Sequence, residues 1–453
     1  MEEMIPLNGR IAIVDDDEKQ ALPLMRVLSR LNIPYTFYKG NDYRFLPEVP
    51  ENDVRILFLD LNLLGNKVET PKTIRSALIP TISRIISANN YPYLLILWSR
   101  QEKQYKETLE DIFQNELKSC APIAIRNYVK SNFFHDYATE EDNTQDDILI
   151  IDELKRIFAE IPAYRYLILW ENLAHTSTDE LVKSIFQNAK QDEWEKVTNV
   201  VLNSLGRAYS GQYFSEASPE EKIKASLFAL NSVLIDFLDN NLATCTINSP
   251  KELDERALTD EVINGIKANL NHKMLVFSKP NNMCEPGVVV QYTNAESNYF
   301  ELLLHKIISI LSIKLKIQYE KPDILDSVLK KETSNRIKQI KQEIQQTWLK
   351  IGIVVTPSCD YAQKKKVYDR IVQGVMIESH FLDYINQGDA FYISPTIKYN
   401  DRNYNVILNF NYFITSNLSA DNCRILFKLR HPVLAEIQSK LARHINRQGI
   451  MNL

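Results

Sequence analysis

The sequence predicts a chain of three parts: an α/β domain built on a parallel sheet (residues 1–138), an all-α region (148–349) and a small β-rich domain with a terminal helix (350–453). Three hydrophobic patterns support this division. In the first part, short apolar runs alternate with segments whose apolar residues recur at helical spacing. In the second part, such helical segments are long and follow one another. Near residue 351 the pattern changes to the alternation of apolar and polar residues that is typical of strands. Residues 139–147 are rich in acidic and amide side chains, which is typical of a solvated linker.

Length and composition indicate a soluble protein of several domains. The chain has 453 residues, of which 45% are hydrophobic and 25% charged, and a domain usually takes about 150 residues. No apolar run approaches the roughly 18 residues of a membrane span. The start, Met1-Glu2-Glu3, lacks the basic residues of a secretory signal. We therefore expect a cytoplasmic protein that does not enter a membrane.

Several function classes are disfavoured. The 5 cysteines are widely spaced, with no CxxC pair and no zinc-finger spacing, which argues against disulfides and structural zinc. With 11 glycines and neither GxxxxGK[ST] nor GxGxxG, the sequence disfavours an ATPase or a dinucleotide enzyme. The net charge of -5 gives no general attraction to nucleic acid. The basic runs near residues 330–350 and 424–447 leave nucleic-acid binding open, but a solvated face is favoured.

Apolar runs in the first part predict five strands, at residues 11–14, 36–38, 56–59, 93–98 and 123–129. Helical spacing separates them at residues 21–31, 78–86 and 109–117. The strand-helix alternation predicts a parallel sheet with right-handed crossovers. Nearly continuous apolar runs are typical of strands that are covered on both faces.

Acidic residues follow two of these strands. Asp15 and Asp16 come after the first strand, and Asp60 comes after the third. The carboxyl ends of parallel strands share one edge of a sheet, where open α/β folds bind ligands. The three carboxylates are therefore expected to converge on one divalent cation. A hard, oxygen-ligated ion such as Mg²⁺ suits them.

Two more strands end in residues that complete a known pattern. Ser99 follows the fourth strand and Lys130 follows the fifth. Together with the three aspartates they resemble the receiver domain of bacterial two-component response regulators, over roughly the first third of the chain. The resemblance implies a flavodoxin-like fold with Asp60 as phosphoacceptor, Asp15, Asp16 and Asp60 as Mg²⁺ ligands, and Ser99 and Lys130 as phosphoryl contacts. It also implies a histidine-kinase-like partner and a regulatory protein rather than an enzyme.

The sequence departs from that family at two places. Lys130 precedes Ser131, where receivers usually have a cis-proline, and a cis bond before serine is intrinsically costly. The position of the usual switch aromatic holds Asn127, whereas Tyr128 is one residue later and points to the other face of the sheet. These departures favour an alternative, a pseudo-receiver scaffold that binds a partner without being phosphorylated.

The middle region is predicted to be helical. The string Ser218-Pro219-Glu220-Glu221 is typical of a helix start, because serine caps the helix and proline suits its first position. A narrow apolar stripe at residues 337, 340, 344 and 348 indicates a coiled-coil-like seam or a helix packed along its neighbours. Helical bodies attached to receivers commonly mediate dimerisation or docking, so a homodimer is one expectation.

Strands are predicted in the last part at residues 351–356, 367–378, 390–393, 404–413 and 424–429, with an amphipathic helix at 432–447. The string Thr356-Pro357-Ser358-Cys359-Asp360, continued by Gln363, resembles a TPxCDxxQ sequence of poorly characterised bacterial proteins from mobile-element and phage-conflict loci. That resemblance implies a role in anti-phage defence. Cys359 is a candidate nucleophile, with His380 further along, although a turn in which Asp360 caps local amides is the favoured interpretation.

Four hypotheses remain open. The first is a phosphorylatable receiver that regulates a helical and β-rich output region, and the second is the pseudo-receiver scaffold. The third is a nucleic-acid-binding transcriptional regulator, against which the lack of a helix-turn-helix signature argues. The fourth is an enzyme that uses Cys359.

Overall fold

The computed structural model describes residues 10–61, 63, 70–90, 92–99, 106–130, 144–186, 193–247, 250–251, 253, 258–277, 280, 282–283, 285–293, 298–362 and 367–446. The chain divides into two compact units. The first consists of Met1–Val197 and Asn231–Leu253, and the second consists of Thr198–Leu230 and Asp254–Leu453. Among the helices in the described ranges, none is long and apolar enough to cross a membrane.

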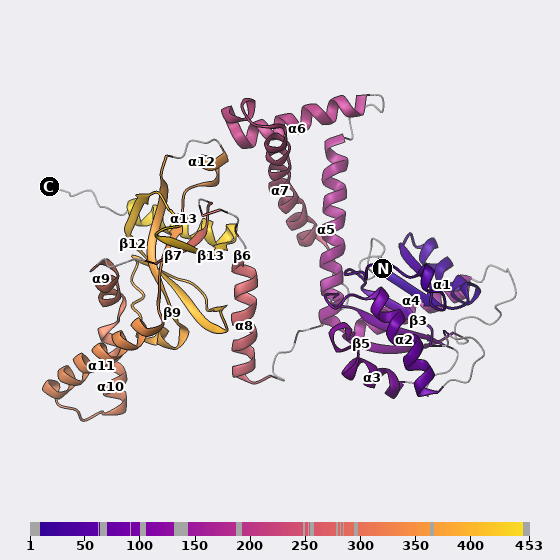
Figure 1. Cartoon of the computed structure of the whole chain (residues 1–453), viewed down its shortest axis with the longest axis horizontal. Coiled ribbons are helices and arrows are strands. Elements are labelled where there is room, and N and C mark those ends of the chain that lie inside the picture. Colours follow the sequence, from indigo (N-terminus) through magenta and orange to yellow (C-terminus); the bar gives the residue numbers. More distant parts are fainter. Residues whose placement is uncertain are drawn as a thin grey trace. The chain divides into compact units, whose positions relative to one another are not determined.

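A parallel five-stranded sheet forms the centre of the first unit (Figure 1). Its strands are β1 (Ile11–Asp15), β2 (Tyr35–Lys39), β3 (Ile56–Leu59), β4 (Leu94–Ser99) and β5 (Ala124–Val129). They lie in the order β2-β1-β3-β4-β5, and all four neighbouring pairs are parallel. This is the strand order of flavodoxin-like doubly wound sheets. The predicted α/β fold with a parallel sheet is confirmed.

Helices cover both faces of this sheet. They are α1 (Glu18–Arg30), α2 (Pro71–Ile85), α3 (Lys106–Asn115) and α4 (Thr144–Glu160), with short 3-10 turns at Tyr43–Phe45 and Lys118–Cys120. Alternate strand residues enter two separate cores: Leu57 packs with α2 and α3, whereas Phe58 packs with α1 and α4. Because both faces are covered, the central strands β1, β3 and β4 carry buried apolar side chains at nearly every position, which explains their continuous apolar runs.

The boundary of the first unit differs from the prediction. Residues 144–147 lie in α4 rather than in a linker, and residues 139–143 are outside the described ranges. Ile150, Leu154 and Phe158 of α4 are buried in the same core as β1 and β3. Tyr164 and Ile168, near the start of α5 (Pro162–Phe186), join this core as well. The sheet requires α4 because one of its faces would otherwise expose apolar side chains to water.

An ionic contact fixes α5 at the end of the sheet opposite the aspartates. Glu171 accepts from Arg10 at 2.5 Å and from Arg55 at 2.9 Å, and both arginines precede strands of the sheet. Burial raises the pKa of the Glu171 carboxyl, but the two guanidinium groups outweigh burial, so the net pKa lies below its usual value. The hydroxyl of Tyr164 donates to the carbonyl of Arg55 at 2.5 Å. The first half of α5 is therefore bound to the α/β core.

The middle of the chain is helical, as predicted, through α6 (Trp194–Ser210), α7 (Pro219–Thr244) and α8 (Asp260–Leu275), with a 3-10 turn at Gly211–Ser215. The predicted start of α7 is confirmed. The amide of Glu221 donates to the Ser218 hydroxyl at 3.3 Å, and the Glu221 carboxylate accepts from the Ser218 amide at 2.8 Å. This reciprocal pair is a capping box.

An antiparallel sheet of eight described strands forms the centre of the second unit (Figure 1). Its strands are β6 (Val276–Phe277), β7 (Val288–Tyr292), β8 (Leu349–Val354), β9 (Asp369–Glu378), β10 (Phe391–Ile393), β11 (Ile397–Tyr399), β12 (Arg402–Ser416) and β13 (Cys423–Leu429). They lie in the order β10-β12-β9-β8-β7-β13-β6, and β11 pairs with β12. The β-rich C-terminal region is confirmed, but β6 and β7 lie in the stretch predicted to be all-α.

Helices on both faces complete the second unit: α9 (Asn298–Ile307), α10 (Ile310–Glu320), α11 (Asp326–Thr347), the short α12 (Ser358–Ala362) and α13 (His431–Asn446), with a 3-10 turn at Ser379–Tyr384. The terminal helix is confirmed, since Leu434 and Ile437 of α13 pack on one face of the sheet. Ile340 and Ile344 of α11 pack with Val375 of β9 on the other face. The predicted stripe of α11 is therefore a packing surface within the unit.

Candidate functional site

The carboxyl ends of β1 and β3 are neighbours in the sheet, and acidic residues occupy both. Asp15 is the last residue of β1, and Asp60 directly follows β3. The amide of Asp60 donates a 2.8 Å hydrogen bond to the carbonyl of Val14, so the parallel pairing extends to Asp60 itself. Asp15 is 0% exposed and Asp60 is 4% exposed. The strand register thus places two buried carboxylates at one edge of the sheet.

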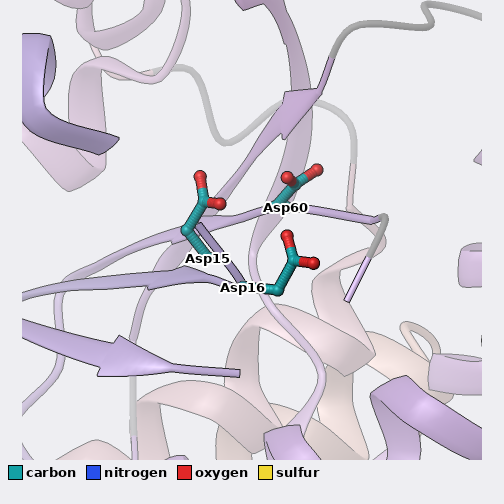
Figure 2. Close-up of side chains that lie close together, drawn as sticks. All are labelled: Asp15, Asp16 and Asp60. Carbon is teal, nitrogen blue, oxygen red and sulfur yellow. The ribbon is translucent and has the colours of Figure 1, made fainter. Parts of the chain in front are cut away.

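Asp16 adds a third carboxylate to the same place (Figure 2). One oxygen atom from each of Asp15, Asp16 and Asp60 lies within 4.8 Å of the other two. Asp16 is only half-buried, so the group is reached from the surface on that side. Carboxylate oxygens in such a group are the ligands that Mg²⁺ and Ca²⁺ prefer. The structure brings together the three acids that the sequence expected to converge, and a cation held by them stays a prediction.

Lys130 enters this cluster from the end of β5. Its ammonium Nζ lies 2.6 Å from Oδ2 of Asp15 and 2.8 Å from Oδ2 of Asp60, and the side chain is fully buried. It also donates to Oε1 of Gln20 at 3.4 Å. A buried ammonium is stable only where carboxylates and hydrogen bonds replace its hydration. Lys130 therefore depends on both aspartates, and they depend on it.

The electrostatic balance of the cluster favours a further cation. Three carboxylates face one ammonium, so full ionisation leaves two uncompensated negative charges. Burial raises the pKa of Asp15 to about 7, opposed by Lys130 and reinforced by the charge of Asp60. Burial and the charge of Asp60 also raise the pKa of Asp16. The raised pKa values express the cost of crowding negative charge, which a bound cation would relieve.

Asp17 has a structural function beside the cluster. Its carboxylate accepts from the amide of Lys19 at 3.1 Å and so caps the start of α1. It also accepts from the side-chain amide of Gln20 at 3.1 Å, while its own amide donates to Asp15 at 3.0 Å. The sequence analysis did not single out Gln20. Its position three residues after a capping aspartate was the only local signal that it lies at this end of the sheet.

Ser99 occupies the expected place in the backbone. It is the last residue of β4 and pairs in register with Val129, the residue before Lys130. The Ser99 side chain and the whole of Ser131 are outside what the structure describes. The phosphoryl contact expected of Ser99 and the absence of a cis bond before Ser131 therefore remain predictions.

Aromatic side chains pack together near the carboxyl ends of β4 and β5. Trp98 is fully buried and stacks on Tyr128, with ring centroids 5.8 Å apart. The Tyr128 hydroxyl donates to the carbonyl of Ile150 in α4 at 3.3 Å. Asn127, at the place of the usual switch aromatic, is exposed. The prediction that Tyr128 points away from the face of Asn127 is confirmed, and the aromatic pair connects the ends of β4 and β5 to α4.

The Cys359 motif lies in the second unit, on the short helix α12. Cys359 is exposed, with its sulfur 3.7 Å from Oδ1 of Asp360, and Asp360 forms a 3.5 Å ion pair with Arg370. His380, the expected base, lies 3.5 Å from Glu378. The ion pair with Arg370 is one contact of the Asp360 carboxylate, and the capping of local amides expected for Asp360 stays a prediction. These contacts fix the turn after β8 and lend no support to a nucleophile.

Comparison of the chain with protein-family models and with curated proteins finds no match. The case for a function therefore depends on the geometry of the first unit.

Proposed function

We propose that the first unit is a receiver-type domain that accepts a phosphoryl group on Asp60 and thereby regulates the rest of the chain. One observation carries the proposal: Asp15, Asp16, Asp60 and Lys130 meet at the carboxyl edge of a sheet with the order β2-β1-β3-β4-β5. Each residue type has a separate task in phosphoryl transfer to a carboxylate, and the cluster contains all of them except the hydroxyl expected from Ser99.

Asp60 is the nucleophile in this proposal. One of its carboxylate oxygens attacks the phosphorus of the donor, the bond from phosphorus to the donor's leaving atom breaks, and the leaving group takes up a proton. The product is an acyl phosphate on Asp60. Asp60 suits this task because its carboxylate belongs to the acidic cluster and also contacts Lys130 through Oδ2.

Asp15, Asp16 and Asp60 would hold Mg²⁺, which fits the size, charge and oxygen donors of the cluster. When bound, Mg²⁺ neutralises the charge that builds up between a phosphoryl group and a carboxylate. Lys130 supplies a second positive charge from inside the sheet, and its burial keeps it from being screened by water. The donor in this proposal is the phosphohistidine of a histidine-kinase-like partner.

A pseudo-receiver scaffold is the second candidate. The observation that favours it concerns the place of the switch aromatic: Asn127 is exposed there, and the neighbouring Tyr128 is buried and hydrogen-bonded to α4. The usual exposed aromatic switch is therefore replaced by a side chain that already has an internal partner. Under this hypothesis, partner binding persists when Asp60 is replaced by Ala.

A titration with beryllofluoride, a phosphoryl mimic, in the presence of Mg²⁺ tests the main proposal. We expect binding of one equivalent and a thermal stabilisation that grows with ligand concentration, on the order of 3 kcal/mol at a hundredfold excess over Kd. The Asp60→Asn variant should show no such response. The matched control is Asp53→Asn, which changes an exposed aspartate of the same unit and should behave like the unaltered protein.

The proposal would be contradicted if beryllofluoride and Mg²⁺ together left both the melting temperature and the backbone amide signals around Asp60 unchanged. Stabilisation by Mg²⁺ alone, with no added effect of beryllofluoride, would support a cation-binding scaffold instead.

A further inference from the structure

Helix α8 in the second unit exposes a regular apolar stripe. Val262, Ile266, Leu270 and Met274 recur at every fourth residue, and Leu258 extends the row ahead of the helix. Each is between 46% and 64% exposed. Residues four apart lie nearly above one another on a helix, so these side chains form one continuous ridge. An exposed apolar ridge of this length is typical of a surface that contacts another protein.

The other side of α8 is the one that its own unit covers. The helix packs against β11, with Ala268 buried at the contact. The side-chain amide of Asn271 donates to the carbonyl of Thr396 at 2.9 Å, and Arg430 donates to the carbonyl of Lys273 at 3.0 Å. Leu275, at the end of the helix, also packs on the core of the unit, whereas the four ridge residues of the helix stay exposed.

Gly265 lies beside the ridge, in the middle of the helix. A glycine there costs about 0.5–1 kcal/mol relative to alanine. A Cβ added at Gly265 would meet nothing within 4 Å, so packing within the described chain does not require the glycine. Because residue 265 has no side chain, the helix surface next to Ile266 allows the backbone of a second helix to approach closely.

The residue before each ridge residue forms a parallel second row: Glu261, Gly265, Asn269 and Lys273. All four are exposed. The row changes from acidic at its start, through two uncharged residues, to basic at its end. In a two-fold antiparallel pair of helices this row faces the same row of the second copy, so its acidic end lies toward the partner's basic end.

We propose that α8 forms a two-fold symmetric interface with α8 of a second copy of this chain, the two helices running antiparallel about Ala268. Ile266 then lies opposite Leu270 of the second copy, and Val262 lies opposite its Met274, because these positions are equally distant from Ala268. On the same side of both helices Glu261 lies beside Lys273 of the second copy. The same patch serves both chains, as an isologous interface requires.

Charge-swap variants of the full chain test this arrangement by sedimentation equilibrium. We expect a dimer for the unaltered protein, and we expect Glu261→Lys and Lys273→Glu each to weaken dimerisation by about tenfold or more, since each creates two like-charge contacts per dimer. The double variant, Glu261→Lys with Lys273→Glu, should restore it. Lys330→Glu, which changes an exposed lysine of α11 in the same unit, is the matched control and should leave the dimer unchanged.

A second variant separates the interface from folding. Gly265→Gln places a long polar side chain where the described chain has open space, so the melting temperature of the monomer should not fall. The dimer should nevertheless be lost, because the helices no longer approach. A protein that stays monomeric from nanomolar to tens of micromolar concentration would overturn the proposal. So would a dimer that survives both single swaps and Gly265→Gln, or a double swap that fails to recover association.

Discussion

Replacement of Asp60 by Asn should eliminate phosphoryl incorporation from a small donor such as acetyl phosphate in the presence of Mg²⁺. The amide cannot act as a nucleophile toward phosphorus, and the other carboxylates cannot take over. Asp15 is fully buried and held by Lys130 and the amide of Asp17, and Asp16 is not paired with the lysine in the described contacts. We expect the loss to be complete and not partial.

Intact mass analysis and hydroxylamine sensitivity measure this result, because an acyl phosphate is cleaved by hydroxylamine and a phosphate ester is not. The control is again Asp53→Asn, which makes the same substitution at an exposed aspartate. A melting curve close to that of the unaltered chain would show that Asp60→Asn remains folded. A phosphoryl group that is still incorporated into the Asp60→Asn variant would place the acceptor elsewhere and refute the assignment.

Replacement of Lys130 by Met should lower the free energy of unfolding by about 3–5 kcal/mol in the absence of divalent cations, because it leaves buried carboxylates without their counter-ion. Chemical denaturation in the presence of a chelator measures the loss. The control is Lys39→Met, the same substitution at an exposed residue that pairs in register with Asp15 on the adjoining strand. It should change stability by no more than a few tenths of a kcal/mol.

Two conditions should offset the cost of Lys130→Met. Mg²⁺ should restore much of the stability by supplying the missing positive charge. Lowering the pH from about 8 to about 6 should also help, because the pKa of Asp15 is already raised to about 7 and protonation removes its charge. The sign follows from linkage: a carboxyl whose pKa is raised on folding stabilises the fold at low pH and loses that contribution as the pH rises. A loss below about 1 kcal/mol would show that the buried ion pairs matter little.

The centre of the first sheet was predictable because β1, β3 and β4 are buried on both faces and so carry uninterrupted apolar runs. The acids after residues 14 and 59 were predictable for a related reason: parallel strands present their carboxyl ends at one edge. The packing of α4 on the sheet was not predictable. The spacing of Ile150, Leu154 and Phe158 shows that the helix has an apolar face, but it does not show which surface that face covers. Helical periodicity carries no information about distant partners.

The strands missed in the second unit have two different explanations. Val288, Val289 and Val290 follow a Pro286-Gly287 turn and were a visible strand signal that the helical interpretation of the region overrode. The two-residue strand β6 has no such signal, since it exists only because β13 pairs with it. Similarly, the position of Lys130 was predictable from its place after β5, but its simultaneous contact with Asp15 and Asp60 depends on three separate segments.

That shared lysine has a consequence for ion selectivity. With Lys130 in place and all three carboxylates ionised, the cluster retains two negative charges, which matches the charge of one divalent cation. A sodium or potassium ion would leave the buried pocket with a net negative charge. For the cation site proposed above, the buried ammonium therefore sets the charge that the bound ion must carry, and we expect divalent cations to bind in preference to sodium or potassium.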